Sequence, residues 1–258
     1  MPGTDNGMIL QDRDRHLLTE LAVMRVIDRE QAKCVAGFGS ITRANSRLLL
    51  LTRNGFLRRF FLGTVGAARK ALYALSPKGA ALAGVPYRVP RRATNQTLAG
   101  DFFTAHQLQI NTLFCLVKYS PIPVEGARCV RWLSFHEPLL SGIPLIPDGY
   151  AEVVTPAKSL AMFLEVDLGN ESRTVWMRKV QSYLRYAVSG KFPERFHQPQ
   201  FRTLVVANSE RRMASLRAAT ITATDKIFWF TTLEAINRNG FWSAIWTRAG
   251  DTARQSLL

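Results

Sequence analysis

The stretch from Leu145 to Gly169, LIPDGYAEVVTPAKSLAMFLEVDLG, decides the fold of the second half of the chain. Two apolar runs within it predict neighbouring β-strands, the second of the buried type. Asp148 stands at the head of the first run, and Glu165 and Asp167 stand two residues apart at the end of the second. Because alternate residues share one face of a strand, an antiparallel pair of strands would bring these three carboxylates together.

Such a carboxylate cluster has one chemical and one structural interpretation. Carboxylate oxygens are the ligands that Mg²⁺ and Mn²⁺ prefer, with Asp148 and Glu165 as the first candidate metal ligands and Asp167 as a third. An ion held there beside a phosphodiester would activate water for hydrolysis. In the alternative, the acids are non-catalytic and only fasten the strand to the next helix, by pairing with its basic residues Arg173, Arg178 and Lys179.

The order of acids resembles the Pro-Asp…Glu-x-Lys signature of the PD-(D/E)xK nuclease superfamily. In that superfamily the lysine orients or activates the attacking water. Here Asp167 occupies the position of the lysine, and Lys179 on the following helix is the candidate replacement. The resemblance implies a nuclease-like domain whose catalytic residues would be Asp148, Glu165, Asp167 and Lys179. Without a working lysine, such a domain would cut nothing.

The chain around this stretch alternates between helical and strand-like patterns, which favours an α/β sandwich over residues 93–258. The predicted elements are a helix from Leu98 through the 110s, a strand at Cys129–Leu133, a helix at Thr174–Val188, a strand at Phe201–Ala207, a helix at Arg211–Ala219 and a strand at Lys226–Phe230. Aromatic residues near the C-terminal end, at Phe228–Phe230 and Phe241–Trp246, indicate either core packing or a self-association surface.

Residues 1–92 predict three helices, a β-hairpin and a closing helix, which is the order of a winged helix-turn-helix domain. The helices cover Asp12–Met24, Asp28–Val35 and Ile41–Asn54, the strands cover Phe56–Leu62 and Lys70–Leu75, and the last helix runs from Pro77 to Ala83. The whole chain is therefore expected to be α+β, with a winged helix-turn-helix domain before a nuclease-like α/β domain.

Basic and polar residues mark the expected DNA-binding surface of residues 1–92. Arginine and asparagine near the start of a third helix can read guanine and adenine edges in the major groove, and arginines around a hairpin tip can hold phosphates. The alternative is an ordinary solvated helix face. The candidates are Thr42, Arg43, Asn45, Arg47 and Arg53 on the third helix, and Arg58, Arg59, Arg69 and Lys70 on the hairpin.

The distribution of charge points to double-stranded DNA as the partner. The chain has a formal net charge of +15 and a sequence pI near 10.5. Residues through Arg92 carry 16 Lys and Arg against 6 Asp and Glu, with no acid between Glu30 and Asp101. An excess of this kind favours binding to polyanions, of which nucleic acid is the commonest in a cytoplasm.

Several function classes lack their sequence signals. No apolar run reaches the ~20 residues needed to span a bilayer, and residues 1–16 do not read as a secretory leader, so we expect a cytoplasmic protein. The cysteines Cys34, Cys115 and Cys129 form no CxxC pair, which argues against a disulfide framework or a zinc site. No phosphate-binding GxxxxGK[ST] loop and no histidine pair of a relaxase are present.

Four sequence features in this order resemble the replication-relaxation family of bacterial plasmids and integrative elements. They are the winged-helix pattern, His106-Gln-Leu-Gln-Ile-Asn111, Pro147-Asp-Gly and the string E-V-D-x-G-x-E from Glu165 to Glu171. The resemblance implies a DNA-binding protein of a mobile element, either a transcriptional regulator or a replication or relaxation accessory. Regulators of this type often bind as two-fold dimers, so we also expect a homodimer.

Overall fold

The computed structural model describes residues 8–62, 70–88 and 101–258 of the chain. It divides into two compact units, Met1–Cys115 and Leu116–Leu258, and the dividing point falls within the helix α5, Asp101–Tyr119. Among the described residues, no helix combines the length and the apolar character that crossing a bilayer requires. Each unit is described separately below.

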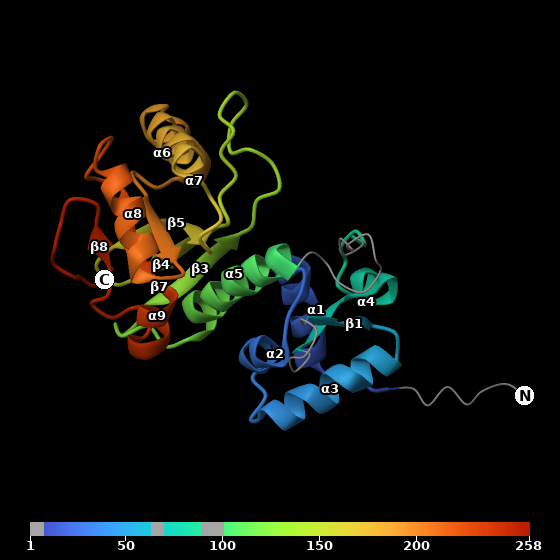
Figure 1. The fold of residues 1–258 in the computed structure, drawn as a ribbon. Coiled ribbons are helices and arrows are strands. Elements are labelled where there is room, and N and C mark those ends of the chain that lie inside the picture. The colour runs from blue at the N-terminus through green and yellow to red at the C-terminus, as the bar shows by residue number, and fades with distance from the viewer. Residues whose placement is uncertain (1–7, 63–69, 89–100) are drawn as a thin grey trace, which may run out of the picture. The chain divides into compact units, whose positions relative to one another are not determined.

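The first unit consists of helices around a two-stranded antiparallel hairpin (Figure 1). Strands β1 and β2 pair from Leu57 opposite Leu75 to Leu62 opposite Lys70. A single bridge between Ile27 and Tyr73 adds a third short segment to the hairpin. The elements in chain order are α1 (Asp12–Met24), α2 (Arg29–Ala36), α3 (Ile41–Arg53), β1 (Leu57–Leu62), β2 (Lys70–Leu75) and α4 (Pro77–Leu82), followed by α5.

Side-chain caps fix where the helices of the first unit begin. Asp28 accepts a hydrogen bond from the Gln31 amide at the start of α2, and Ser40 does the same for α3. Ser76 caps α4, in which proline occupies the first helical position. The helix starts expected at Asp28, Ile41 and Pro77 lie within one residue of the observed starts, because a residue able to cap stands directly before each apolar pattern.

The N-terminal part of α5 is joined to the first unit by buried hydrogen bonds. The Asn111 side-chain amide donates to the carbonyl oxygens of Met24, at 3.1 Å, and Val26, at 2.5 Å. The Gln31 side-chain amide donates to the Leu108 carbonyl oxygen at 2.8 Å. Packing thus divides the chain inside α5, whereas the division into functional domains at residue 92 stays a prediction.

The second unit contains a six-stranded mixed sheet in the order β3-β4-β5-β6-β7-β8. Strands β3, β4 and β5 are antiparallel, β5, β6 and β7 are parallel, and β8 is antiparallel to β7. Figure 1 shows α6 and α8 above this sheet and α9 below it. The elements are β3 (Arg128–Leu133), β4 (Gly149–Val154), β5 (Ser159–Asp167), α6 (Arg173–Val188), α7 (Lys191–Phe196), β6 (Arg202–Ala207), α8 (Glu210–Thr220), β7 (Phe228–Thr232), α9 (Leu233–Asn239) and β8 (Thr247–Arg248).

An aromatic cluster fills the space between the sheet and the helices above it. Phe163 on β5 lies at its centre, with ring centroids 5.0 Å from Tyr150 and 4.9 Å from Phe201. Burying rings of this size is the largest hydrophobic contribution available to a domain core. The further aromatic members of the cluster are Trp176, Tyr183, Tyr186, Phe192, Phe196, Phe228 and Phe230.

The mixed α+β architecture confirms the predicted fold class. The aromatic residues near the C-terminal end are buried: Phe241 and Trp246 lie with ring centroids 5.2 Å apart, and the Trp246 indole donates to the Phe241 carbonyl oxygen. They therefore pack into the protein, as the first of the two interpretations expects. Three short elements, α7, α9 and β8, were not predicted.

Candidate functional site

The register of β4 against β5 brings the two first candidate acids together. Gly149, the first residue of β4, lies opposite Leu164, so Asp148 and Glu165 are the next facing pair. The Asp148 carboxylate accepts a hydrogen bond of 2.8 Å from the Val166 amide. Its negative charge raises the pKa of Glu165, although burial is the larger cause. The predicted proximity of these two acids is thus present.

Glu165 is a buried carboxylate whose two oxygens are both engaged. It is 1% exposed. The Tyr183 hydroxyl donates to Oε1 at 2.5 Å, and the Lys179 ammonium donates to Oε2 at 2.9 Å. Loss of hydration disfavours the charged form, so burial raises the pKa of Glu165 to about 7 even though Lys179 and Tyr183 favour the carboxylate.

Lys179 bridges two acids from its place on α6. Its ammonium lies 2.9 Å from Glu165 Oε2 and 2.9 Å from Glu171 Oε1. Burial alone would lower the pKa of Lys179, but attraction to Glu165, Asp148 and Glu171 outweighs burial and raises it. Lys179 is therefore a fixed positive charge at neutral pH and cannot accept a proton as a general base.

Asp167 is held by an arginine from α8. The Arg212 guanidinium makes two parallel hydrogen bonds to the carboxylate, Nε to Oδ1 and Nη2 to Oδ2, each 2.7 Å long. It also donates to the Glu171 carbonyl oxygen at 2.6 Å, and its side chain is 18% exposed. A two-pronged pair of this kind is the strongest geometry available to an arginine and a carboxylate.

The acids and bases together form one network, which links β5 to α6 through Lys179 and to α8 through Arg212. Both side-chain oxygens of Glu165 and of Asp167 already accept hydrogen bonds from cations or a hydroxyl group. Over residues 8–62, 70–88 and 101–258, no group of three or more His, Cys, Asp or Glu side chains is placed to hold a metal ion. The donor set therefore does not fit Mg²⁺ or Mn²⁺.

Two partners proposed for these acids on sequence grounds lie elsewhere. Arg173 and Arg178 are exposed on the outer side of α6. Arg212, which takes their place at Asp167, belongs to the predicted helix 211–219, but no spacing in the sequence connects it to Asp167. The pairing depends on how α8 packs against the sheet.

The candidate DNA-binding residues of α3 fall into two groups. Thr42, Arg43 and Arg53 are exposed, as the prediction requires. Asn45 is half-buried, and the Tyr73 hydroxyl donates to its side-chain oxygen at 3.4 Å. Arg47 points into the unit, so the first group is the most accessible to a partner molecule, and a role for Asn45 stays a prediction.

Arg47 is a structural residue, which corrects its expected position on the outer face of α3. Its side chain is only 17% exposed, and its guanidinium contacts the carboxylate of fully buried Asp14 through two hydrogen bonds, the Nε one 2.8 Å long. The same carboxylate accepts the Gln11 amide at 2.8 Å. A buried carboxylate needs a paired cation. Both charges stand on the apolar stripes of their helices, a signal that sequence reasoning missed.

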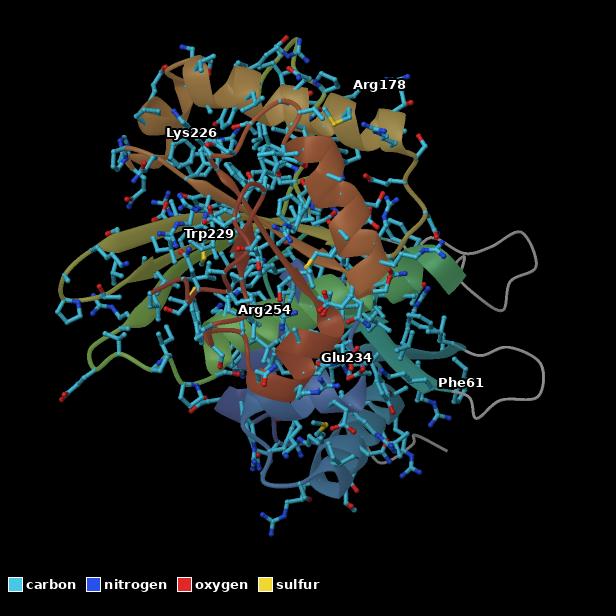
Figure 2. All side chains as sticks on the ribbon, turned by 60° about the vertical axis from the view of Figure 1, so that its left-hand side comes forward. Phe61, Arg178, Lys226, Trp229, Glu234 and Arg254 are labelled. Carbon is cyan, nitrogen blue, oxygen red and sulfur yellow. The ribbon has the colours of Figure 1, made fainter. Side chains whose placement is uncertain are left out.

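On the hairpin, Arg58 and Arg59 are exposed and rest on aromatic rings. The Arg58 guanidinium lies 5.5 Å from the Tyr87 ring centroid, and that of Arg59 lies 5.1 Å from the Phe61 ring centroid. Figure 2 shows Phe61 near the end of the hairpin. Lys70 is half-exposed and lies 2.5 Å from Asp28, while Arg69 falls outside the described residues.

Lys78, which sequence reasoning did not include, adds an exposed positive charge at the start of α4. Its ammonium donates to the Asn54 carbonyl oxygen at 3.2 Å and lies 4.5 Å from the Phe56 ring centroid. Both contacts hold it close to the end of α3. A lysine directly after Ser76-Pro77 would have been the signal, because the helix start fixes its position.

Comparison with protein families gives one match: the model described as replication-relaxation matches residues 16–197. The matched range runs from within α1 to the end of α7 and therefore contains Glu165, Lys179 and most of the carboxylate network. No curated protein and no solved structure matches the chain. Since the family model covers more than half of the sequence, the chain belongs to the replication-relaxation family.

Proposed function

We propose that this protein binds double-stranded DNA through the first unit and that the second unit does not cleave it. Family membership supports a role in the replication or relaxation of a plasmid or another mobile element. The observation that carries DNA binding is a group of four exposed arginines on neighbouring elements of the first unit. They are Arg43 and Arg53 on α3 and Arg58 and Arg59 on β1.

These four arginines have no acidic partner among the described residues. Three acids of the first unit pair with other cations: Asp14 with Arg47, Asp28 with Lys70 and Glu30 with Arg29. Guanidinium groups without carboxylate partners are suited to binding DNA phosphates. Neutralising the phosphate charges releases counterions, and this release supplies most of the non-specific affinity for DNA. The first unit thus keeps its structural charges paired and leaves these arginines to an external polyanion.

The order of elements supports a winged helix-turn-helix. Three helices precede a hairpin, and the Ile27–Tyr73 bridge ties the segment between α1 and α2 to β2. In this architecture the third helix enters the major groove and the hairpin follows a phosphate backbone. On that basis Thr42 and Arg43, at the N-terminal end of α3, read base edges, while Arg58 and Arg59 hold phosphates.

A binding titration tests this assignment. Duplex sites selected by the full-length protein from a random library serve as probe, with fluorescence anisotropy as readout. The double variant Arg43→Ala with Arg53→Ala should bind the selected site about tenfold or more weakly, since each base or phosphate contact contributes on the order of 1–3 kcal/mol. Arg58→Ala with Arg59→Ala should weaken binding to every sequence and reduce its salt dependence.

The matched control removes two exposed charges from the second unit, Arg128→Ala with Lys226→Ala, and should leave binding to the selected site unchanged. Wild-type affinity in both arginine variants of the first unit would refute the proposed interface. Arg47 is excluded from the test because its loss acts through the fold.

The second unit is proposed as non-catalytic because its acids are neutralised inside the protein. Lys179 and Arg212 occupy the carboxylate oxygens that a metal ion would need. A metal-dependent endonuclease or nickase using Asp148, Glu165, Asp167 and Lys179 is the alternative. One observation favours it: the Lys179 ammonium reaches Glu165 from α6, as a replacement for the missing lysine of the nuclease signature would.

A cleavage assay on supercoiled plasmid distinguishes a non-catalytic second unit from a metal-dependent endonuclease. We expect no nicked or linear product after incubation with the protein and either Mg²⁺ or Mn²⁺. Nicking that disappears in Asp148→Ala and in Lys179→Met would establish the endonuclease instead. Nicking that persists in both variants would indicate a contaminant and leave the non-catalytic proposal standing.

Assembly as a two-fold homodimer on repeated half-sites is also proposed, because DNA-binding modules of this kind commonly bind palindromic sites. Light scattering with and without the selected duplex tests it. A mass of one chain per duplex at saturating protein would contradict the dimer.

A further inference from the structure

The outer side of α6 carries a groove lined by three arginines. Arg173, Arg178 and Arg185 line an open depression of about 550 Å³, together with Thr174, Gln181 and Pro144. Figure 2 shows Arg178 on the outer side of α6. All lining residues belong to the second unit.

The charge of this groove has no partner within the described protein. Helix α6 contains four basic residues and no acid. Lys179 turns inward to Glu165 and Glu171, whereas the three arginines are exposed and form no ion pair among the described residues. Among the described residues, the one hydrogen bond of their guanidinium groups runs from Arg185 to the Ser182 hydroxyl, at 3.4 Å. One basic side chain of α6 is therefore paired inside the protein, and the other three are left accessible to an external anion.

We propose that the groove of α6 binds the phosphate backbone of duplex DNA, as a second contact separate from α3 and β1. Twelve residues separate Arg173 from Arg185, a rise of about 18 Å along the helix. That length corresponds to about five phosphates of one strand at roughly 3.4 Å of axial rise each. The hydroxyl of Thr174 and the amide of Gln181 add neutral donors of the kind that position a backbone without reading its sequence.

The shape and chemistry favour a polynucleotide over other anions. The groove is open and elongated along a helix, so it offers several spaced charges rather than a closed site for one small anion. Its two apolar lining residues, Met177 and Pro144, do not form the continuous hydrophobic face that membrane insertion requires. The choice of duplex DNA as the ligand rests on the proposed function, whereas the groove as a site for an extended anion rests on its own residues.

The test measures how the affinity of the full-length protein for a duplex of about 40 base pairs depends on salt concentration. Arg173→Ala, Arg178→Ala and Arg185→Ala are combined in one variant. Each phosphate contact contributes about 0.9 to the slope of log affinity against log salt, so the slope should decrease by about 2–3. Replacing the same residues by lysine keeps the charges and should largely restore the slope.

A matched variant, Arg128→Ala with Lys158→Ala and Lys226→Ala, removes three exposed charges of the same unit outside the groove and should leave the slope unchanged. In Figure 2, Lys226 lies well away from Arg178. Equal slopes in the groove variant and in this control would overturn the proposal, as would selective loss of binding to vesicles of anionic phospholipid with DNA binding intact.

The result is independent of the first unit. If Arg58→Ala with Arg59→Ala leaves binding unchanged while the groove variant reduces the salt slope, the first-unit interface fails and the α6 contact stands. If the reverse holds, the α6 contact fails alone. Thermal unfolding of each variant, followed by tryptophan fluorescence, verifies that the second unit is folded.

Discussion

The Lys179 ammonium on α6 lies 2.9 Å from Glu165 Oε2 on β5. In the Pro-Asp…Glu-x-Lys signature the positive charge comes from the strand, two residues after the glutamate, and here Asp167 occupies that place. A lysine from the covering helix therefore balances the buried glutamate. Because Asp167 pairs with Arg212, Glu165 and Asp167 are balanced by cations from two different helices, α6 and α8.

The first prediction concerns the pH dependence of stability. Burial raises the pKa of Glu165 from an ordinary 4.5 to about 7, so between these values the folded state binds more protons than the unfolded state. Linkage then requires the free energy of unfolding to fall as pH rises through this window, by on the order of 3 kcal/mol, and to level off above it. Glu165→Gln, which cannot titrate, should abolish that fall.

All five tryptophans lie in the second unit, so their fluorescence during urea unfolding reports on that unit alone. Urea unfolding curves at about pH 5, 6, 7 and 8 give the slope of the free energy of unfolding against pH. Glu194→Gln, an exposed acid of the same unit, is the control and should behave as wild type. A slope that is the same in Glu165→Gln and in the wild type would show that Glu165 does not titrate in this window.

The second prediction separates a folding role from a binding role for Arg47. Arg47→Met leaves the fully buried Asp14 carboxylate without its cation and should destabilise the first unit by about 3 kcal/mol. Hydrogen exchange of peptides from α1 and α3, followed by mass spectrometry, measures this loss. The exposed Arg43→Met should stay within about 0.5 kcal/mol of the wild type. Equal protection in both variants would mean that the Asp14 pair contributes little.

Local sequence patterns sufficed to predict most of the fold, because caps and periodicity act over a few residues. Ser40 and Ser76 before apolar patterns, and the continuous apolar run of β5, sufficed to predict these elements without tertiary information. The proximity of Asp148 to Glu165 also followed, since two antiparallel strands joined by a short loop have few possible registers. Short elements such as α7, six residues with a proline, have no periodicity to detect.

The partners of the acids could not be predicted, because they come from distant segments. Arg212 is 45 residues from Asp167 and reaches it only because α8 packs beside α6 on the same face of the sheet. Arg47 and Asp14 are 33 residues apart, and each is unfavourable on its apolar stripe until the other is present. Sequence periodicity shows on which face of its own helix or strand a charged residue lies. It does not show which charged residue of another element pairs with it.

The third prediction tests close packing at the start of α4. A Cβ added at Gly79 would lie 2.1 Å from the Phe56 carbonyl oxygen, which also accepts a hydrogen bond from the Ser76 amide. Helix propensity alone would make Gly79→Ala stabilising by about 1 kcal/mol. The contact with backbone reverses the sign, and we expect a loss of about 2–3 kcal/mol in the first unit.

Gly39→Ala is the matched control, since its added Cβ meets only the flexible end of Arg43, at 3.5 Å. It should change the stability of the first unit by less than about 0.5 kcal/mol. Hydrogen exchange of peptides from α3 and β2 gives both values. A stabilised Gly79→Ala variant would show that α4 can move away from Phe56 at little cost.

The fourth prediction concerns the thiols of Cys34 on α2 and Cys115 on α5. A hydrogen bond with Cys115 lowers the pKa of Cys34 to about 7, against the opposing effect of burial, and Lys33 lowers it further. The same interaction, with burial, raises the pKa of Cys115. Because the thiolate is the nucleophile, alkylation of Cys34 by iodoacetamide should increase with pH through about 7 and then level off.

The Cys34 thiol lies 4.0 Å from the Cys115 carbonyl oxygen, a contact that Cys115→Ala keeps. Cys115→Ala removes only the thiol that lowers the pKa of Cys34 and should move this midpoint toward the ordinary value of 9.0, whereas Cys115→Ser keeps a polar side chain there and should retain a lowered midpoint. Peptide mass spectrometry separates Cys34 from Cys129, which is also partly accessible. An unchanged midpoint in Cys115→Ala would assign the reactivity to Lys33. The thiol of α5 would then have no part in setting the chemistry of α2.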